Sequence, residues 1–268
     1  MIMDYISRYG LEFNPFVKGE KEFLVETPQY REVITRLNYL LQIKGFGLLT
    51  GMPGAGKTTT LRNWISSLNQ SAHRVIYVPL STLTVTEFYR YLASELGCEP
   101  SFRKSDNFRN IQSAVNRLVT EKRVTPIFIL DEANYLKNAA LNDLKILFNF
   151  DMDSHNKAVV LLCGLPQLAL TLNLNAHEPL RQRITMNYTI PPLTQEEARK
   201  YIKDKLNEVH CHQEVFEKNA LEAIVNSSNG VPRMLDKIAN ASLLIGNSLN
   251  ENIITADTVM KAVNDTAL

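Results

Sequence analysis

The feature that most constrains the fold is the octapeptide GMPGAGKT at residues 51–58. An apolar run at residues 46–50 precedes it, and a segment typical of a helix begins at Thr59. Glycines at this spacing let successive backbone N–H groups converge on phosphate oxygens, and the following helix N-terminus adds positive potential. The octapeptide therefore predicts a P-loop between a strand and a helix.

A P-loop in this context predicts that the chain binds ATP together with Mg²⁺. Lys57 is expected to neutralise charge on the β- and γ-phosphates, and the Thr58 hydroxyl is expected to ligate Mg²⁺. The loop residues expected to contact the nucleotide are Gly51, Pro53, Gly54, Ala55, Gly56, Lys57, Thr58 and Thr59.

The second half of such a site is predicted at residues 127–132, which read Ile-Phe-Ile-Leu-Asp-Glu. A buried strand would deliver Asp131 at its carboxyl end, where the carboxylate can join the coordination sphere of Mg²⁺. Glu132 is then placed to polarise the attacking water. An apolar run that ends in Asp-Glu is common by itself, but behind a P-loop it favours hydrolysis over mere nucleotide binding.

Five apolar runs of strand length indicate the fold class. Most of them are continuous rather than alternating, as in strands that are covered on both faces. Helix-length segments between the runs imply crossover connections, and hence an α/β domain with a parallel five-stranded sheet. The runs cover residues 46–50, 75–80, 127–130, 159–163 and 187–190.

The pattern changes after Pro191-Pro192, beyond which no strand is predicted. Thr194-Gln-Glu-Glu197 is a capping box that starts a helix through about Val209. We therefore predict an α/β nucleotide-binding domain over residues 1–192 and a small helical lid domain over residues 193–268. The further helices expected in the lid cover residues 216–227, 232–246 and 255–264.

Composition favours a cytoplasmic protein. Lys and Arg (29) nearly balance Asp and Glu (28), so the net charge of +1 does not by itself indicate a nucleic-acid-binding protein. The three cysteines form no Cys-x-x-Cys motif, which suits reduced thiols. The N-terminus lacks a signal-peptide pattern, and Pro166 and Gln167 interrupt the uncharged stretch 158–176, so no membrane span is expected.

His210-Cys211-His212 resembles a metal-binding cluster at first sight. We expect these three residues to lie in a helix, where side chains one and two positions apart point in different directions. No metal site is therefore expected there.

Arginines are candidates for two further roles. Gly230-Val-Pro-Arg233 places Arg233 in the first turn of the third lid helix, where it is expected to sense the γ-phosphate. Arg181 and Arg183 precede the last strand. Either is a candidate arginine finger, a side chain that contacts the nucleotide of a neighbouring subunit and stabilises charge there, and Arg183 is slightly favoured. The alternative for each is an ordinary structural or surface role.

Taken together, these motifs resemble an AAA+ ATPase over nearly the whole chain. The chain most resembles the ExeA-like group of these ATPases. That group includes secretion-pathway ATPases and the ATPases of mobile elements, and the latter are similar to the transposition regulators TnsC, MuB and IstB. The segments that carry it are residues 13–16 (Phe-Asn-Pro-Phe), 45–51, 180–184 and 230–233.

The resemblance implies roles for residues outside the P-loop. The N-terminal segment, residues 1–44, is expected to contribute to the adenine pocket, which makes Phe13, Pro15 and Phe16 candidates for contact with the base. The alternative is that these side chains simply pack in a core.

A γ-phosphate sensor is expected near the end of the strand at residues 159–163. Leu165 stands where relatives often carry Gln or Thr, and the sequence leaves open whether Cys163 or Gln167 replaces it. This departure predicts slow hydrolysis, and an arginine supplied by a neighbouring subunit would make that hydrolysis depend on oligomer formation.

The resemblance further implies that ATP-bound subunits assemble into rings or helical filaments on duplex DNA, select a target there and recruit or stimulate a transposase. Residues 98–126 carry six basic and three acidic side chains. Arg103 and Lys104, and more weakly Lys137, are candidates for phosphate contacts that are indifferent to base sequence. The alternative is an ordinary solvated helix of mixed charge.

Three functions follow as hypotheses. The first is a DNA-binding AAA+ regulator of transposition, which leaves the DNA when its ATP is hydrolysed. We favour this hypothesis because the chain ends at Leu268, without the membrane segment and cell-wall domain of secretion-type relatives. The second is an ATPase for secretion or envelope assembly that acts through a separate membrane partner. The third is a nucleotide-gated scaffold with negligible hydrolysis, which Leu165 keeps open.

Overall fold

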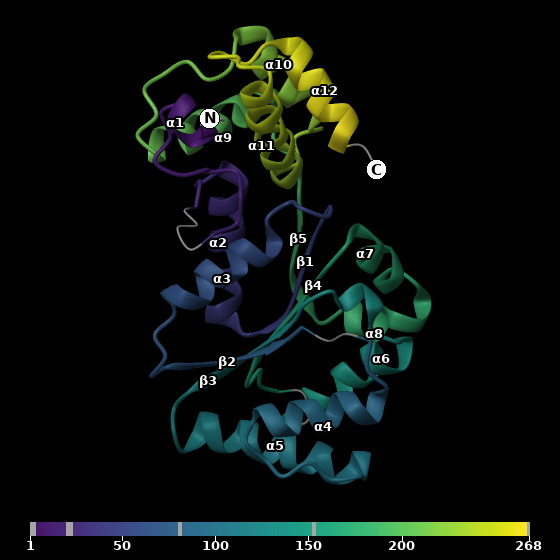
Figure 1. Ribbon diagram of the computed structural model, residues 1–268. Coiled ribbons are helices and arrows are strands. Elements are labelled where there is room, and N and C mark those ends of the chain that lie inside the picture. The colour runs from purple at the N-terminus through teal and green to yellow at the C-terminus, as the bar shows by residue number, and fades with distance from the viewer. Residues whose placement is uncertain (1–3, 20–23, 80–81, 152–153, 267–268) are drawn as a thin grey trace. The chain divides into compact units, whose positions relative to one another are not determined.

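The structure is a computed structural model and divides into two compact units (Figure 1). It describes residues 4–19, 24–79, 82–151 and 154–266. The first unit, here called the sheet unit, comprises residues 32–53 and 57–190. The second, here called the helical unit, comprises residues 1–31, 54–56 and 191–268.

A five-stranded parallel sheet forms the centre of the sheet unit and confirms the predicted α/β fold. The strands follow the order β2-β3-β4-β1-β5, and every neighbouring pair is parallel. Each predicted apolar run falls on one strand, but the second run extends past the end of its strand at Val78: Pro79 follows the strand, and Leu80 lies outside the described residues. The strands are β1 (Gly45–Gly51), β2 (His73–Val78), β3 (Thr125–Leu130), β4 (Val159–Gly164) and β5 (Ile184–Ile190).

The sheet is covered on both faces, as the continuous apolar runs predicted. Alternate strand residues such as Phe46, Leu48 and Phe128 face one large core with the helices α4 to α8. On the other face, Gly47 lets helix α2 approach closely, because a Cβ there would clash with the Leu40 side chain. The helices are α2 (Pro28–Ile43), α3 (Lys57–Ser67), α4 (Val85–Glu95), α5 (Lys104–Thr120), α6 (Asn138–Leu147), α7 (Pro166–Leu172) and α8 (Glu178–Arg181).

Two short 3₁₀ turns connect elements near the carboxyl ends of the strands. The turn η1 (Ala133–Tyr135) leads from β3 into α6, and η3 (Asn175–His177) leads from α7 into α8. Both ring nitrogens of the buried His177 lie at hydrogen-bond distance from α6, 2.9 Å from Asn142 Oδ1 and 3.2 Å from Asn138 Oδ1. His177 therefore ties the start of α8 to α6.

The helical unit packs four C-terminal helices around a core of its own. The predicted capping box at Thr194 and Glu197 is present at the start of the first of them. The N-terminal helix α1 (Tyr5–Arg8) belongs to the same unit, and Tyr9, Leu11 and Phe16 are buried in its core. The four helices are α9 (Gln195–Glu208), α10 (Lys218–Ser227), α11 (Pro232–Ser248) and α12 (Ala256–Thr266).

Two expectations about the chain's organisation differ from the structure. Residues up to Arg31 group with the C-terminal helices rather than with the sheet, because their apolar side chains complete the helical core. The expectation that residues 210–212 are helical is wrong: α9 ends at Glu208, and His210 has a φ of 52°.

Among the described residues, no group of three His, Cys, Asp or Glu side chains is arranged to hold a metal ion. Within the same described ranges, no helix is both long and apolar enough to cross a bilayer. The uncharged stretch that begins at residue 158 instead forms the buried strand β4 and then helix α7.

Candidate nucleotide-binding site

Sheet topology brings the two predicted halves of the site to one edge. Strand β1 ends at Gly51, where the P-loop begins, and β3 ends at Leu130, one residue before Asp131. Strand β4 lies between β1 and β3 and ends at Gly164. Ligands of open parallel sheets bind outside the carboxyl ends of the strands, so this edge is the candidate site.

Lys57 is the first residue of α3 and is 6% exposed. Its Nζ donates hydrogen bonds to two carbonyl oxygens of the loop, those of Gly51 (2.7 Å) and Met52 (3.2 Å). A nucleotide phosphate would compete with these carbonyls for the ammonium group. The ammonium group of Lys57 is thus held beside the loop that is predicted to bind the phosphates.

The loop glycines adopt backbone conformations that side chains disfavour. Gly54 has a φ of +82° and Gly56 a φ of +90°, in the region that glycine enters at no steric cost. Gly54–Gly56 group with the helical unit, where the Arg233 backbone N–H donates to the Gly54 carbonyl (3.3 Å). A Cβ at Gly54 would lie 2.6 Å from the Cβ of Arg233, so the loop tolerates no side chain here.

Asp131 is the best-supported candidate ligand for Mg²⁺, because it is 4% exposed and its carboxylate is oriented by several donors. Its Oδ2 accepts hydrogen bonds from the hydroxyls of Tyr77 (2.7 Å) and Thr58 (3.3 Å). Its Oδ1 accepts from the Glu132 backbone N–H (2.9 Å). A carboxylate beside a threonine hydroxyl supplies the hard oxygen ligands that Mg²⁺ prefers.

Glu132, the candidate general base, follows Asp131 in a left-handed conformation. Its φ is 51°, which is uncommon for a residue with a Cβ and is found preferentially at functional sites. The residue is exposed, whereas Asp131 beside it is buried. This turn therefore separates the two carboxylates: one lies within the protein and the other faces solvent, where an attacking water is available.

Sequence reasoning missed two residues at this edge, Tyr77 and Asn134. Tyr77 is the penultimate residue of β2, and burial together with its hydrogen bond to Asp131 raises the pKa of its phenol well above the usual range. Asn134 Oδ1 accepts a hydrogen bond from the Leu165 backbone N–H (3.0 Å). Asn134 therefore ties the turn after Asp131-Glu132 to the end of β4.

The candidates for the γ-phosphate sensor lie beyond the end of β4 or within it. Cys163 is fully buried, and desolvation is the largest cause of the strongly raised pKa of its thiol. Gln167 lies in the first turn of α7 and is exposed. Asn134, which also approaches Gly164, joins these two as a candidate.

The two finger candidates are held by backbone carbonyls of their own chain. Arg181 donates to the Asn173 carbonyl (2.8 Å), and Arg183 donates to the Lys145 carbonyl at the end of α6 (2.8 Å). The Arg183 guanidinium also lies 5.8 Å from the centre of the Phe46 ring, and burial lowers its pKa. Arg183 is thus the more firmly anchored of the two.

The candidate DNA-contacting residues lie at the N-terminal ends of two helices of the sheet unit. Arg103 is the exposed residue before α5, and Lys137 is the exposed residue before α6. Lys104 forms an ion pair with Asp143 and lies 5.2 Å from the centre of the Tyr89 ring. Lys104 therefore already has contacts within its own chain, whereas its contact with DNA stays a prediction.

The N-terminal candidates for the adenine pocket lie in the helical unit. Phe16 is buried and meets Phe216 edge to face, with ring centres 6.5 Å apart. The Pro15 carbonyl accepts a hydrogen bond from Lys205 Nζ (3.0 Å), and Phe13 packs against the same core. These contacts fit the packing alternative, and a contact with the base stays a prediction.

Comparison with known proteins finds similarity to an AAA domain and to a secretion-pathway protein. Residues 41–172 match the family model described as an AAA domain. General secretion pathway protein A of Aeromonas hydrophila is 28% identical over 247 residues, which cover 90% of this chain and 44% of that protein. The chain therefore spans less than half the length of this relative.

Solved structures show the same fold. Cdc6p from Pyrobaculum aerophilum superposes with a TM-score of 0.71 at 16% identity, over 93% of this chain and 70% of that one. The ORC1 protein of Aeropyrum pernix, solved in complex with DNA, gives a TM-score of 0.64 at 17% identity over 98% and 69%. The AAA+ P-loop fold and a similarity to general secretion pathway protein A are thus confirmed, while the similarity to transposition regulators stays a prediction.

Proposed function

We propose that this chain binds ATP with Mg²⁺ at the carboxyl edge of its sheet and hydrolyses it to ADP and phosphate. The observation that carries the proposal is that Lys57 and Thr58, at the start of α3, and Asp131, just after β3, lie at one edge of the sheet, with the Thr58 hydroxyl bonded to the Asp131 carboxylate. Mg²⁺ held by Thr58 and Asp131 would neutralise charge on the β- and γ-phosphates.

The residues of the site divide the chemistry among them. When nucleotide binds, Lys57 replaces its hydrogen bonds to the loop carbonyls with contacts to phosphate oxygens. The ammonium group then stabilises negative charge that develops during phosphoryl transfer. Glu132 orients and polarises the water that attacks the γ-phosphate, as its exposure beyond the end of β3 allows. Arg233 is expected to sense the γ-phosphate. Either Arg181 or Arg183 is expected to stabilise the negative charge on the nucleotide of a neighbouring subunit.

The partner that best accounts for the basic residues is duplex DNA. Arg103, Lys104 and Lys137 lie at helix N-terminal ends, which add positive potential of their own. ATP-bound subunits would assemble on DNA as a ring or helical filament and recruit or stimulate a transposase, and hydrolysis would disassemble them. The solved ORC1 structure in complex with DNA lends general support to a nucleic-acid role.

Binding to random-sequence duplex DNA, measured with and without ATP at two salt concentrations, tests this function. We expect affinity that requires ATP and falls steeply with salt, as contacts to phosphate groups do. Lys57→Ala is the matched control, because it removes the nucleotide response and leaves the basic residues intact. An affinity that ATP does not change at either salt concentration would contradict the proposal.

A second candidate function is assistance to secretion or envelope assembly, and the specific observation in its favour is the similarity to general secretion pathway protein A. Such a protein would act through a separately encoded membrane partner. Affinity purification followed by identification of bound proteins separates the two functions. Capture of an inner-membrane protein, together with no affinity for DNA, would favour this candidate.

A nucleotide-gated scaffold is the third candidate, since Leu165 supplies no polar side chain at the expected sensor position. Comparison of ATP turnover by the wild type and Glu132→Gln tests it. Equal and slow turnover by the two proteins would favour the scaffold and would remove Glu132 from the catalytic role.

A further inference from the structure

Tyr77 lies where strand β2 meets the candidate ligand of Mg²⁺. Strands β2 and β3 pair in parallel, with Tyr77 opposite Ile129 and Val78 opposite Leu130. The backbone N–H of Asp131 extends this pairing, because it donates to the Val78 carbonyl (3.0 Å). The pairing fixes the main chain of Asp131 against β2, and the side chain of Tyr77 then reaches its carboxylate.

Of the three hydrogen bonds to the Asp131 carboxylate named above, the one from the hydroxyl of Tyr77 is the shortest. This hydroxyl donates to Oδ2 at 2.7 Å, whereas the Thr58 hydroxyl donates to the same atom at 3.3 Å. The second oxygen, Oδ1, accepts from the Glu132 N–H at 2.9 Å. Because Thr58 is itself a candidate ligand of the metal, Tyr77 is a donor that can hold Oδ2 without also belonging to the metal's ligand set.

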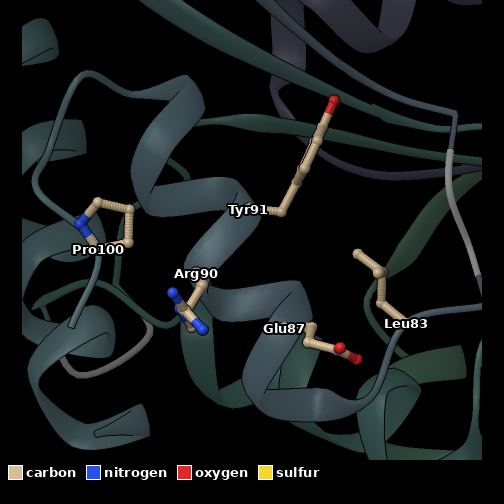
Figure 2. A pocket seen from close by; sticks show the side chains of 5 residues that line it. All are labelled: Leu83, Glu87, Arg90, Tyr91 and Pro100. Carbon is tan, nitrogen blue, oxygen red and sulfur yellow. The ribbon is translucent and has the colours of Figure 1, made fainter. Parts of the chain in front are cut away.

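Tyr77 is in turn held from the helix that covers this face of the sheet. The hydroxyl of Tyr91 on α4 donates to the Tyr77 backbone carbonyl (3.3 Å). Figure 2 shows Tyr91 extending from α4 with its hydroxyl directed away from the helix, beside the pocket that it lines with Leu83, Glu87, Arg90 and Pro100. The contact from Tyr91 reaches the main chain of β2 and not the carboxylate.

We propose that Tyr77 is a positioning residue that holds the Asp131 carboxylate in the orientation required for the binding of Mg²⁺ with nucleotide, an inference that rests on the proposed function. Hydrogen bonds from outside the ligand set orient metal-binding carboxylates, and their removal typically weakens metal affinity about 10- to 100-fold. The hydroxyl of Tyr77 fixes one rotamer of Asp131 before the metal arrives, so less orientational freedom is lost on binding.

The test is the affinity of purified protein for a fluorescent, non-hydrolysable ATP analogue, measured with EDTA and then across a Mg²⁺ titration. Tyr77→Phe removes only the hydroxyl. We expect this variant to bind the analogue as the wild type does in EDTA, and to require about 10-fold more Mg²⁺ for the increase in affinity. The readout is binding, so it does not depend on turnover.

Two further variants separate positioning from a general structural effect. Tyr91→Phe is the matched control, because it removes a hydroxyl that bonds to β2 but not to Asp131, and we expect its Mg²⁺ requirement to stay within about two-fold of the wild type. In an Asp131→Asn background, Tyr77→Phe should have no additional effect on the Mg²⁺ response, since the two residues would act through one carboxylate.

The outcomes distinguish the inference from the function on which it rests. A Mg²⁺ requirement of Tyr77→Phe equal to that of the wild type would overturn the inference, as would an equal loss of affinity with and without Mg²⁺. A Tyr91→Phe variant as impaired as Tyr77→Phe would also overturn it. Failure of the wild type to bind the analogue under any condition would instead overturn the proposed function, and the inference with it.

Discussion

Charges are presented differently at the candidate nucleotide-binding edge and at the basic surface, which is defined here as Arg103, Lys104 and Lys137 at the starts of α5 and α6. At the edge, Lys57 and Asp131 are almost completely buried. Lys57 donates to two carbonyls of the P-loop, and Asp131 accepts from hydroxyls on two different elements. On the basic surface, Arg103 and Lys137 are exposed, and Lys104 is paired with Asp143. Both sets lie in the sheet unit.

This difference bears on how much each region says about function. Burial of a charge is costly unless specific partners compensate it, so two buried charges that each have hydrogen-bond partners, Lys57 and Asp131, indicate a built site. An exposed arginine or lysine has little desolvation cost and suits many roles. Changes at the edge should therefore have large effects, and changes on the basic surface should have small, salt-dependent ones.

Replacement of Lys57 should give the largest effect. Lys57→Ala removes the ammonium that would meet the β- and γ-phosphates, and we expect loss of detectable ATP binding and of all ATP-dependent assembly. Calorimetric titration with ATP and sedimentation with and without ATP measure the two effects. ATP-dependent assembly in this variant would contradict the P-loop assignment.

Removal of the finger should come next, and should appear only in the assembled protein. An arginine supplied in trans contributes on the order of 10³ or more to the rate, so either Arg181→Ala or Arg183→Ala should lower turnover by about that factor while subunits still bind ATP. ATPase rates measured against protein concentration, with a thermal melt of each variant, check this. Unchanged turnover in both variants would exclude a finger in this segment.

A smaller reduction is expected for Glu132→Gln, which keeps the shape of the side chain and removes the base. General-base catalysis typically contributes about 10²- to 10⁴-fold, so turnover should fall by about 10²-fold or more, with ATP affinity unchanged. Single-turnover hydrolysis is the measurement. Because Glu132 is exposed, we expect thermal stability equal to that of the wild type, which would show that the effect is chemical.

The smallest effect is expected on the basic surface. Arg103→Gln should weaken duplex binding a few-fold and reduce the slope of log affinity against log salt by about 1, as for the loss of one phosphate contact. Fluorescence anisotropy with a labelled random duplex measures both quantities. Lys203→Gln is the matched control, an exposed lysine on α9 in the helical unit; an equal effect of the two substitutions would remove the basic surface from the DNA interface.

Elements with a strong local signal were predicted correctly from the sequence. The buried strands read as continuous apolar runs, and the capping box at Thr194 marked a helix start because its two reciprocal hydrogen bonds involve residues only three positions apart. Strand β5 was predicted three residues too short, since it lies at the edge of the sheet and its first residues, from Ile184, alternate in burial.

Residues whose role depends on non-local pairing escaped the sequence analysis. Nothing near Tyr77 in the chain marks it as a partner of Asp131, which lies 54 positions away and is brought close only by the pairing of β2 with β3. The packing of Tyr9 and Phe16 with the C-terminal helices is likewise invisible in the sequence, because no local pattern records which distant core an apolar side chain enters.

The sequence by itself determined the phosphate-binding loop, the Asp131-Glu132 pair and the order of strands and helices, because each depends on residue types at short, fixed spacings. The tertiary structure decided which side chains orient Asp131, which carbonyls hold Lys57 and the arginines, and which unit takes the N-terminal residues. Those choices depend on strand order and on packing between segments far apart in the chain, which the pairing of the sheet and the burial of apolar surface settle only once the chain has folded.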